Sequence, residues 1–230
     1  KPFENILKNR LKGSPSFRDP GTTADNQLLS GFARWLFPAV GFEMYAEYGR
    51  EDHSWDKRDF AQEPDQSRAY GLGFRKLLRM SPERMDGLTV ELMNFDLPHL
   101  ARTGRGEGSI YVHGIMRQGH TQRGQLLGAD VGVGAASGST VRWDRYAPRG
   151  RSTVALHRAV RRNRGSFFGS GVVDPRSAEV HYTIEAARMR RVRGMAVTAG
   201  LGLTHALNRD FRSDATNLSA LVSARIPLSR

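Results

Sequence analysis

The stretch QGHTQRGQLLG, residues 118–128, sets polar and charged side chains between glycines and ends in an apolar pair. Side chains of these types suit three kinds of site: a phosphate cradle, a catalytic turn around His120, or a bend that presents polar groups to a ligand. His120 has no catalytic partner at a recognisable spacing. We therefore expect Gly119 and Gly124 to let the backbone bend sharply. The side chains held in fixed directions by such a bend are those of Thr121, Arg123 and Gln125.

No other motif in the chain carries specific chemistry. The glycine-rich segment 132–138 (GVGAASG) lacks the lysine of a phosphate-binding loop, and no helical pattern follows it. The histidines form no HxH or HExxH spacing, and there is no GxSxG elbow. Two carboxylate pairs, Glu43 with Glu47 and Glu179 with Glu185, have the residue types of a glycosidase but no further support. The sequence therefore predicts no catalytic residue, no metal site and no cofactor.

The charge balance favours an anionic partner. The chain has 35 Lys and Arg against 23 Asp and Glu, a formal net charge of +12, and most of the cations are arginine. Arginine suits phosphates and carboxylates, so the partners to weigh are nucleic acid, lipid phosphate and acidic polysaccharide, with a solvated basic surface as the alternative. The clusters RAVRRNR (158–164) and RMRRVR (188–193) contain no aromatic residue for base stacking, so we expect no nucleic acid. Both clusters lie where strands are expected to end, and they suit lipid phosphates there.

Cysteine is absent, which excludes disulfides and thiolate chemistry. The chain begins at Lys1 with no apolar signal segment, so we expect either a removed signal or a fragment. The longest uncharged run in the second half, residues 194–208, is shorter than the roughly 18 apolar residues of a spanning helix. If the protein lies in a membrane, it is therefore expected to do so as a β-barrel.

Alternation of apolar and polar residues predicts β-strands along most of the chain. In GFEMYAEYGRED (41–52) one face has aromatic and aliphatic residues and the other has Glu43, Tyr45 and Glu47. Other alternating stretches are SRAYGLGFRKLL (67–78), GLTVELMNFD (87–96), SAEVHYTIEA (177–186), GMAVTAGLGL (194–203) and ATNLSALVSARI (215–226). Shorter candidates are NQLLSGFARWLF (26–37), SIYVHGIM (109–116) and STVALHRAV (152–160).

The predicted fold is all-β: an antiparallel transmembrane β-barrel with about ten strands seen here, an incomplete part of a larger barrel. Short basic turns alternate with long polar connections, which we place at 50–67, 96–108, 134–150 and 163–177. Residues 1–25 are expected to form a segment with a short helix, PFENILKNRLK, and residues 26–230 the barrel portion. A soluble antiparallel sheet with one solvated face remains the alternative.

The order of several motifs resembles the C-terminal part of the Wzi family of capsule-assembly outer-membrane proteins. The motifs are NQLLSGFARWLFP, GFEMYAEYGRED, DFAQEPDQSRAYGLGFRKLL, VELMNFDLPH and IYVHGIMRQGHTQRGQLLGADVGVG. The resemblance implies a barrel in the bacterial outer membrane that contacts membrane lipids and binds capsular polysaccharide. Such a protein attaches or assembles the capsule in a lectin-like, non-enzymatic role. The alternative functions are a soluble basic β-domain that binds nucleic acid and a general porin-type barrel.

Sugar binding needs aromatic faces and planar hydrogen-bonding groups on rigid strand ends, and acidic sugars add a need for arginine. Candidate polysaccharide-binding residues on this basis are Tyr45, Glu47, Arg50, Asp52, Arg68, Tyr70, Thr121, Arg123 and Gln125. The alternative for each of them is a network of arginines, carboxylates and amides that fills the barrel interior.

Overall fold

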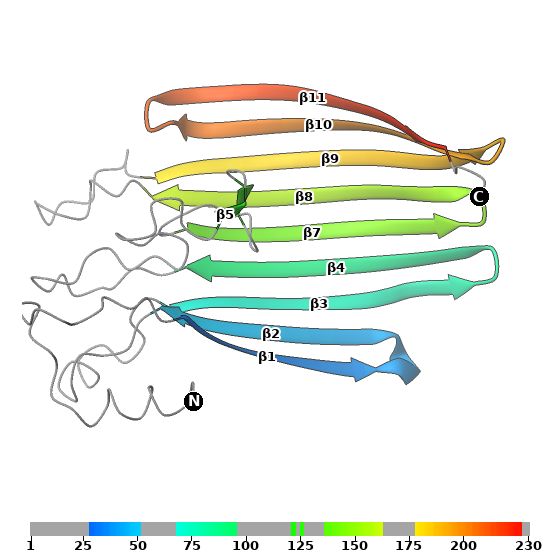
Figure 1. The fold of residues 1–230 in the computed structure, drawn as a ribbon, viewed down its shortest axis with the longest axis horizontal. Helices are drawn as coiled ribbons and strands as arrows, with labels where there is room; N and C mark the ends of the chain where they lie inside the picture. Colours follow the sequence, from blue (N-terminus) through cyan, green and yellow to red (C-terminus); the bar gives the residue numbers. More distant parts are fainter. Residues whose placement is uncertain are drawn as a thin grey trace, which may run out of the picture.

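The computed structural model describes residues 28–51, 68–95, 121–122, 125–126, 136–162 and 178–226. These residues form a nine-stranded antiparallel sheet, a separate two-stranded sheet and one short 3-10 helix (Figure 1). The fold is therefore all-β, as predicted. No helix within the described residues is long and apolar enough to cross a membrane.

The strands of the large sheet have 10–15 residues each. They are β1 (Leu28–Phe37), β2 (Phe42–Glu51), β3 (Arg68–Ser81), β4 (Arg84–Phe95), β7 (Ala136–Ala147), β8 (Gly150–Arg162), β9 (Ala178–Val192), β10 (Met195–Arg209) and β11 (Ser213–Arg225). The 3-10 helix η1 (Pro38–Val40) joins β1 to β2. The two-stranded sheet pairs β5 (Thr121–Gln122) with β6 (Gln125–Leu126).

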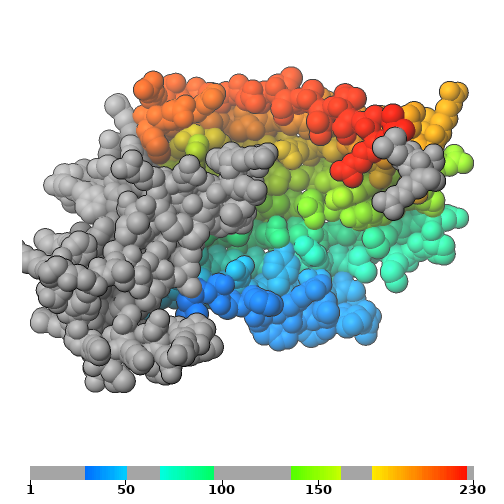
Figure 2. Space-filling view, viewed as in Figure 1, coloured from blue at the N-terminus to red at the C-terminus, as the bar shows by residue number. Residues whose placement is uncertain are grey.

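Strands that are consecutive along the described chain are neighbours in the large sheet, in the order β1-β2-β3-β4-β7-β8-β9-β10-β11. Each neighbouring pair is antiparallel. Within the described residues β1 and β11 are edge strands that do not pair with each other, so the sheet is open (Figure 1). The space-filling view shows its strands side by side from β1 and β2 in blue to β11 in red (Figure 2).

The short connections gather at one end of the sheet, which we call the turn end; the opposite end is the far end (Figure 1). The turn end holds η1 and the two-residue turns after β3, β7 and β9. In the turn between β9 and β10, Arg193 and Gly194 both have positive φ, as a two-residue hairpin turn with right-handed strand twist requires. The short turn between β10 and β11 lies at the far end.

The prediction of a long connection at 134–150 is wrong, because most of that segment is strand β7. The alternation is present in ASGSTVRWDRYA, where Val141 and Trp143 face one side. Small residues open the strand and charged residues fill its second half, so the sequence looked like a loop. In the structure the charge of Asp144 is compensated by ion pairs with Arg142 and Arg151, which a sequence pattern does not show.

Two adjacent rows of residues show how sharply the two faces of the sheet differ. Residues directly opposite each other on paired strands point to the same face. The first row has one residue from each strand and is apolar throughout: Trp35, Met44, Phe74, Val90, Val141, Leu156, Ile184, Leu203 and Leu218. The second row lies on the opposite face and has no aliphatic residue: Arg34, Tyr45, Gly73, Glu91, Thr140, His157, Thr183, Thr204 and Asn217.

We call the two sides the apolar face and the polar face after these rows. The division predicted from alternation is confirmed for every strand named in the sequence analysis that falls within the described residues. Exceptions on the polar face are apolar residues such as Phe32 and Leu36 on the edge strand β1 and Met93 on β4.

Burial in this sheet is the reverse of that in a soluble domain. The buried apolar residues among those described are alanines of the polar face: Ala69, Ala136, Ala155 and Ala206. Thr89, Asp144 and Glu179 of the same face are buried as well. The large apolar side chains of the other face are instead exposed; those of Leu72, Leu156, Leu203 and Leu218 are examples. The nine strands of the large sheet therefore form a single layer, with no apolar interior among the described residues.

Several predictions fall outside the described residues. They are the whole 1–25 segment with its opening helix, the strand at 109–116, and the connections at 96–108 and 163–177. Of the connection predicted at 50–67, residues 50 and 51 belong to β2 and the rest lie outside the described residues.

Candidate functional site

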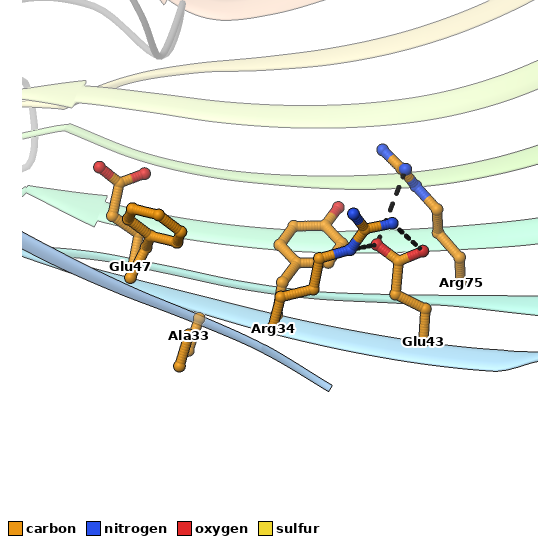
Figure 3. A pocket seen from close by; sticks show the side chains of 8 residues that line it. Ala33, Arg34, Glu43, Glu47 and Arg75 are labelled. Carbon is orange, nitrogen blue, oxygen red and sulfur yellow. Dashed lines mark hydrogen bonds and ion pairs between the residues drawn. The ribbon is translucent and has the colours of Figure 1, made fainter. Parts of the chain in front are cut away.

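A shallow depression on the polar face of β1, β2 and β3 is the site with the strongest chemical features among the described residues. Its polar lining includes two arginines and two carboxylates, and its aromatic lining is Phe32 and Tyr45. The complete lining is Phe32, Ala33, Arg34, Glu43, Tyr45, Ala46, Glu47 and Arg75 (Figure 3). Tyr45 and Glu47 were predicted as binding residues from the sequence.

Glu43 holds two arginines at one side of the depression. Arg34 donates two hydrogen bonds to it, from Nε to Oε1 at 2.8 Å and from Nη2 to Oε2 at 3.0 Å. Arg75 approaches the same carboxylate less closely, with Nη1 3.9 Å from Oε1 (Figure 3). The Arg75 side chain is 52% exposed, so much of its guanidinium group faces outward. A planar guanidinium group in this setting has N–H donors left for a ligand carboxylate or hydroxyl.

The ring of Tyr45 forms the floor of the depression, and a glycine makes its position possible. Tyr45 lies directly opposite Gly73 on β3. A Cβ atom on Gly73 would collide with the tyrosine ring. With no side chain there, the ring lies over the β3 backbone and its hydroxyl donates a hydrogen bond to Glu91 on β4. The Arg75 guanidinium lies over the ring, 5.5 Å from its centre. The ring is therefore held by Arg75 at its face and by Glu91 at its hydroxyl.

Phe32 and Glu47 form the open side of the depression and are directly opposite each other on β1 and β2. Phe32 is 86% exposed, the most exposed large apolar residue among those described. Glu47 is also exposed, and no hydrogen bond or ion pair joins it to another described residue. An exposed aromatic face beside a carboxylate and arginines is a combination that suits a hydroxyl-rich ligand such as a sugar.

The other predicted binding residues do not join this depression. Arg50, Arg68 and Tyr70 lie at the far end on the apolar face, with Arg50 opposite Arg68 and Tyr70 opposite Tyr48. Tyr70 accepts a hydrogen bond at 3.2 Å from the side-chain amide of Asn94. The structure thus brings Arg50, Arg68 and Tyr70 together, but on the face opposite to Tyr45 and Glu47.

The opening motif of the sequence lies partly outside the described residues. Asp52 and Arg123 belong to the part of the chain that the structure does not describe. Thr121 and Gln125 lie in β5 and β6, where Gln122 pairs with Gln125. Gly119 and Gly124, at which the bend is predicted, lie outside the described residues.

Sequence analysis missed Phe32, Arg34, Glu43 and Arg75 as members of the site. Glu43 was assigned to the same face as Tyr45 and Glu47, but its partners come from neighbouring strands whose register was unknown. A usable signal was Phe32, because a large aromatic residue at a polar position of an alternating strand is unusual.

Two further polar clusters occupy the ends of the polar face. Asp144 at the turn end accepts hydrogen bonds from Arg142, Arg151 and Thr153. Glu179 at the far end binds Arg161 at 3.0 Å and accepts a hydrogen bond from His181. Between them, the Thr140 hydroxyl lies 3.0 Å from Nδ1 of His157, and His157 Nε2 lies 3.7 Å from Glu185. These groups are satisfied by one another, and no three His, Asp or Glu side chains among the described residues are grouped as metal ligands.

Carboxylates at the sheet ends are stabilised in the charged form. Burial by itself favours neutral Glu179, but the hydrogen bond from His181 and the charge of Arg161 outweigh it and keep the pKa of Glu179 below its ordinary value. At the turn end, hydrogen bonds from Arg84 and Arg145 lower the pKa of Asp86.

Comparisons with known proteins add no relative: no protein-family model, curated protein or solved structure matches the chain.

Proposed function

We propose that the sheet is part of a β-barrel wall in the bacterial outer membrane, with the apolar face toward lipid and the polar face toward the interior. The observation that carries this proposal is the reversed burial, with small and polar residues buried and large apolar residues exposed. In water such a face would cost free energy over its whole area, whereas in a bilayer it meets an apolar solvent. Strands of 10–15 residues are long enough, because a tilted membrane strand needs about 9–11.

In this proposal two rows of the apolar face carry aromatic residues that suit the borders of a membrane. One row contains Tyr48 and Tyr70 near the far end, and the other contains Leu88 and Trp143 near the turn end. Tyrosine and tryptophan are enriched at the two membrane–water interfaces of such barrels. Glu179, Asp86 and the turns lie beyond these rows, toward the two ends of the sheet.

We further propose that the depression around Tyr45 binds an acidic polysaccharide and that the protein thereby helps to attach or assemble a capsule. The support is the set of Phe32, Tyr45 and Arg75 on one open surface, together with the resemblance of the motifs to the Wzi family. The ligand would stack on Phe32 and Tyr45, donate hydroxyl hydrogen bonds to Glu47 and accept from Arg75. No step of this function breaks a covalent bond.

Neighbouring residues on β10 provide the test of the membrane part. The chain has no cysteine, so Leu203→Cys and Thr204→Cys each introduce a single thiol at nearly the same depth on opposite faces. After reconstitution in vesicles, we expect a lipid-soluble maleimide to label Leu203→Cys and a charged maleimide to label only Thr204→Cys. Equal labelling of both thiols by the charged reagent would favour the soluble-sheet alternative.

Two exposed residues of β1 provide the test of the sugar part. Phe32→Ala removes the open aromatic face of the depression, and Leu36→Ala truncates an apolar residue of the same face that does not line it. We expect Phe32→Ala to weaken retention on immobilised polygalacturonate by about fivefold, since an aromatic contact contributes about 1 kcal/mol. Leu36→Ala should leave retention unchanged.

Retention on immobilised ligands also distinguishes the alternative functions. Arg75→Gln should lower retention on polygalacturonate and leave the weaker retention on neutral dextran unchanged. Retention of DNA with a steep salt dependence, in place of polygalacturonate, would indicate a nucleic-acid binder. A wild-type protein that inserts into vesicles but is retained on no polysaccharide would indicate a porin-type barrel.

A further inference from the structure

A cluster of arginines borders the apolar face at the turn end. Arg145 on β7 and Arg188 on β9 both lie directly opposite Ser152 on β8, which places the three in one row. Arg190 follows Arg188 two residues later on the same face, opposite Gly150. We call Arg145, Ser152, Arg188 and Arg190 the turn-end arginine patch.

The patch has cations that the described carboxylates do not neutralise. Arg145 donates from Nε to Asp86 at 3.1 Å, but Asp86 also binds Arg84. Arg188 and Arg190 are exposed, and no ion pair joins either to another described residue. Strands are about 4.8 Å apart, so Arg145 and Arg188 are separated by about 10 Å at the backbone. Ser152 lies between them on β8, and its hydroxyl adds a further donor.

The surroundings of the patch are apolar on the side toward the middle of the sheet. The next row inward contains Trp143, Val154 and Ala186, and the Arg145 guanidinium lies 4.7 Å from the Trp143 ring centre. On β10, Val197 and Ala199 lie opposite Arg190 and Arg188. A ligand that contacts both the arginine patch and the apolar residues beside it must have an anionic head joined to an apolar body. Free phosphate and nucleic acid would contact only the arginine patch.

We propose that the turn-end arginine patch binds the phosphate of an anionic membrane lipid, whose acyl chains lie along the apolar face. This inference rests on the proposed membrane location and adds a specific lipid contact to it. Arginine holds phosphate oxygens by paired hydrogen bonds, and Ser152 supplies a neutral donor between the arginines. The patch would thereby fix how deeply the turn end lies in its leaflet.

The test compares two double variants that remove equal charge from the same turn. Arg188→Gln with Arg190→Gln alters the patch. Arg191→Gln with Arg193→Gln is the control, because Arg191 lies on the polar face and Arg193 in the turn itself. Each protein is mixed with vesicles of phosphatidylcholine alone or of equal parts phosphatidylcholine and phosphatidylglycerol, and the bound fraction is measured by flotation.

We expect wild type to bind both vesicles and to bind the anionic ones more tightly. Each arginine near an anionic surface contributes about fivefold to binding, so removing two should reduce the patch variant's preference for anionic vesicles by roughly 25-fold. The control variant should lose much less of this preference. Equal losses in both variants, or no loss in either, would overturn the lipid site. Failure of wild type to bind phosphatidylcholine vesicles would instead contradict the membrane location, so the two failures are distinguishable.

Discussion

Tyr45 reaches Glu91 across an intervening strand, because the residue between them is Gly73. The relationship ties β2, β3 and β4 together by one side chain and orients the aromatic floor of the depression. It also makes the site sensitive to a single added methyl group on β3.

Gly73→Ala is therefore expected to destabilise the protein and disturb the site. Its Cβ would overlap the Tyr45 ring, and forced repacking of this kind costs about 1–3 kcal/mol. We expect a lower urea midpoint together with weaker retention on polygalacturonate. Gly71→Ala is the matched control on the same strand and face, because its Cβ would meet only the Met93 methyl at 3.8 Å. Equal effects of the two substitutions would refute the role of Gly73.

Tyr45→Phe separates the position of the ring from its hydrogen bond. The substitution keeps the ring over Gly73 and removes the donor to Glu91. A hydrogen bond to a charged group contributes about 1.5–3 kcal/mol, so we expect the unfolding free energy to fall by that order. In a double-mutant cycle with Glu91→Gln, the two effects should be clearly non-additive. Additive effects would mean that the two groups do not interact in solution.

Stability at low pH should depend on the Glu179 cluster. Glu179 is 2% exposed and its folded-state pKa lies below the ordinary value, so its contribution is fully present above pH 4.5. It is lost as the pH falls through the folded-state pKa, because the protonated carboxyl no longer attracts Arg161. We expect Glu179→Gln to lower the unfolding free energy by about 1–3 kcal/mol at neutral pH and to flatten its acid dependence. An unchanged acid dependence in this variant would assign the acid sensitivity to other carboxylates.

Arginine substitutions at Leu218 and Asn217 test whether the apolar face lies in a bilayer or in water, with the unfolding free energy as the measured quantity. Leu218 is 72% exposed on the apolar face of β11, and its neighbour Asn217 is exposed on the polar face. In water an arginine at either position should change the unfolding free energy by less than about 0.5 kcal/mol. In a bilayer Leu218→Arg is expected to cost about 2–4 kcal/mol, while Asn217→Arg stays small. Reversible unfolding in lipid vesicles measures both.

The alternation of apolar and polar residues was sufficient to predict the all-β fold class and the two faces of the sheet. Successive side chains of a strand point to opposite faces, so the residue types at alternate positions show which face is apolar. The prediction failed at β7, where small residues open the strand and charged residues fill its second half, so Val141 and Trp143 alone gave too weak an alternation. The depression could be predicted only in part. Tyr45 and Glu47 stood out by residue type, but Arg34 and Arg75 enter the site through the register of β1 and β3, which no local pattern gives.

The order of the strands has a consequence for how the sheet is made. Each strand pairs with the strand before it in the described sheet, so no pairing skips over another strand of that sheet. Such a sheet can grow by adding one strand at a time in the order of the chain. The cost is that every partly built sheet ends in an unpaired strand, as β1 and β11 do here. Until the next strand arrives, that open edge can pair with another chain, so aggregation competes with each step of sheet growth.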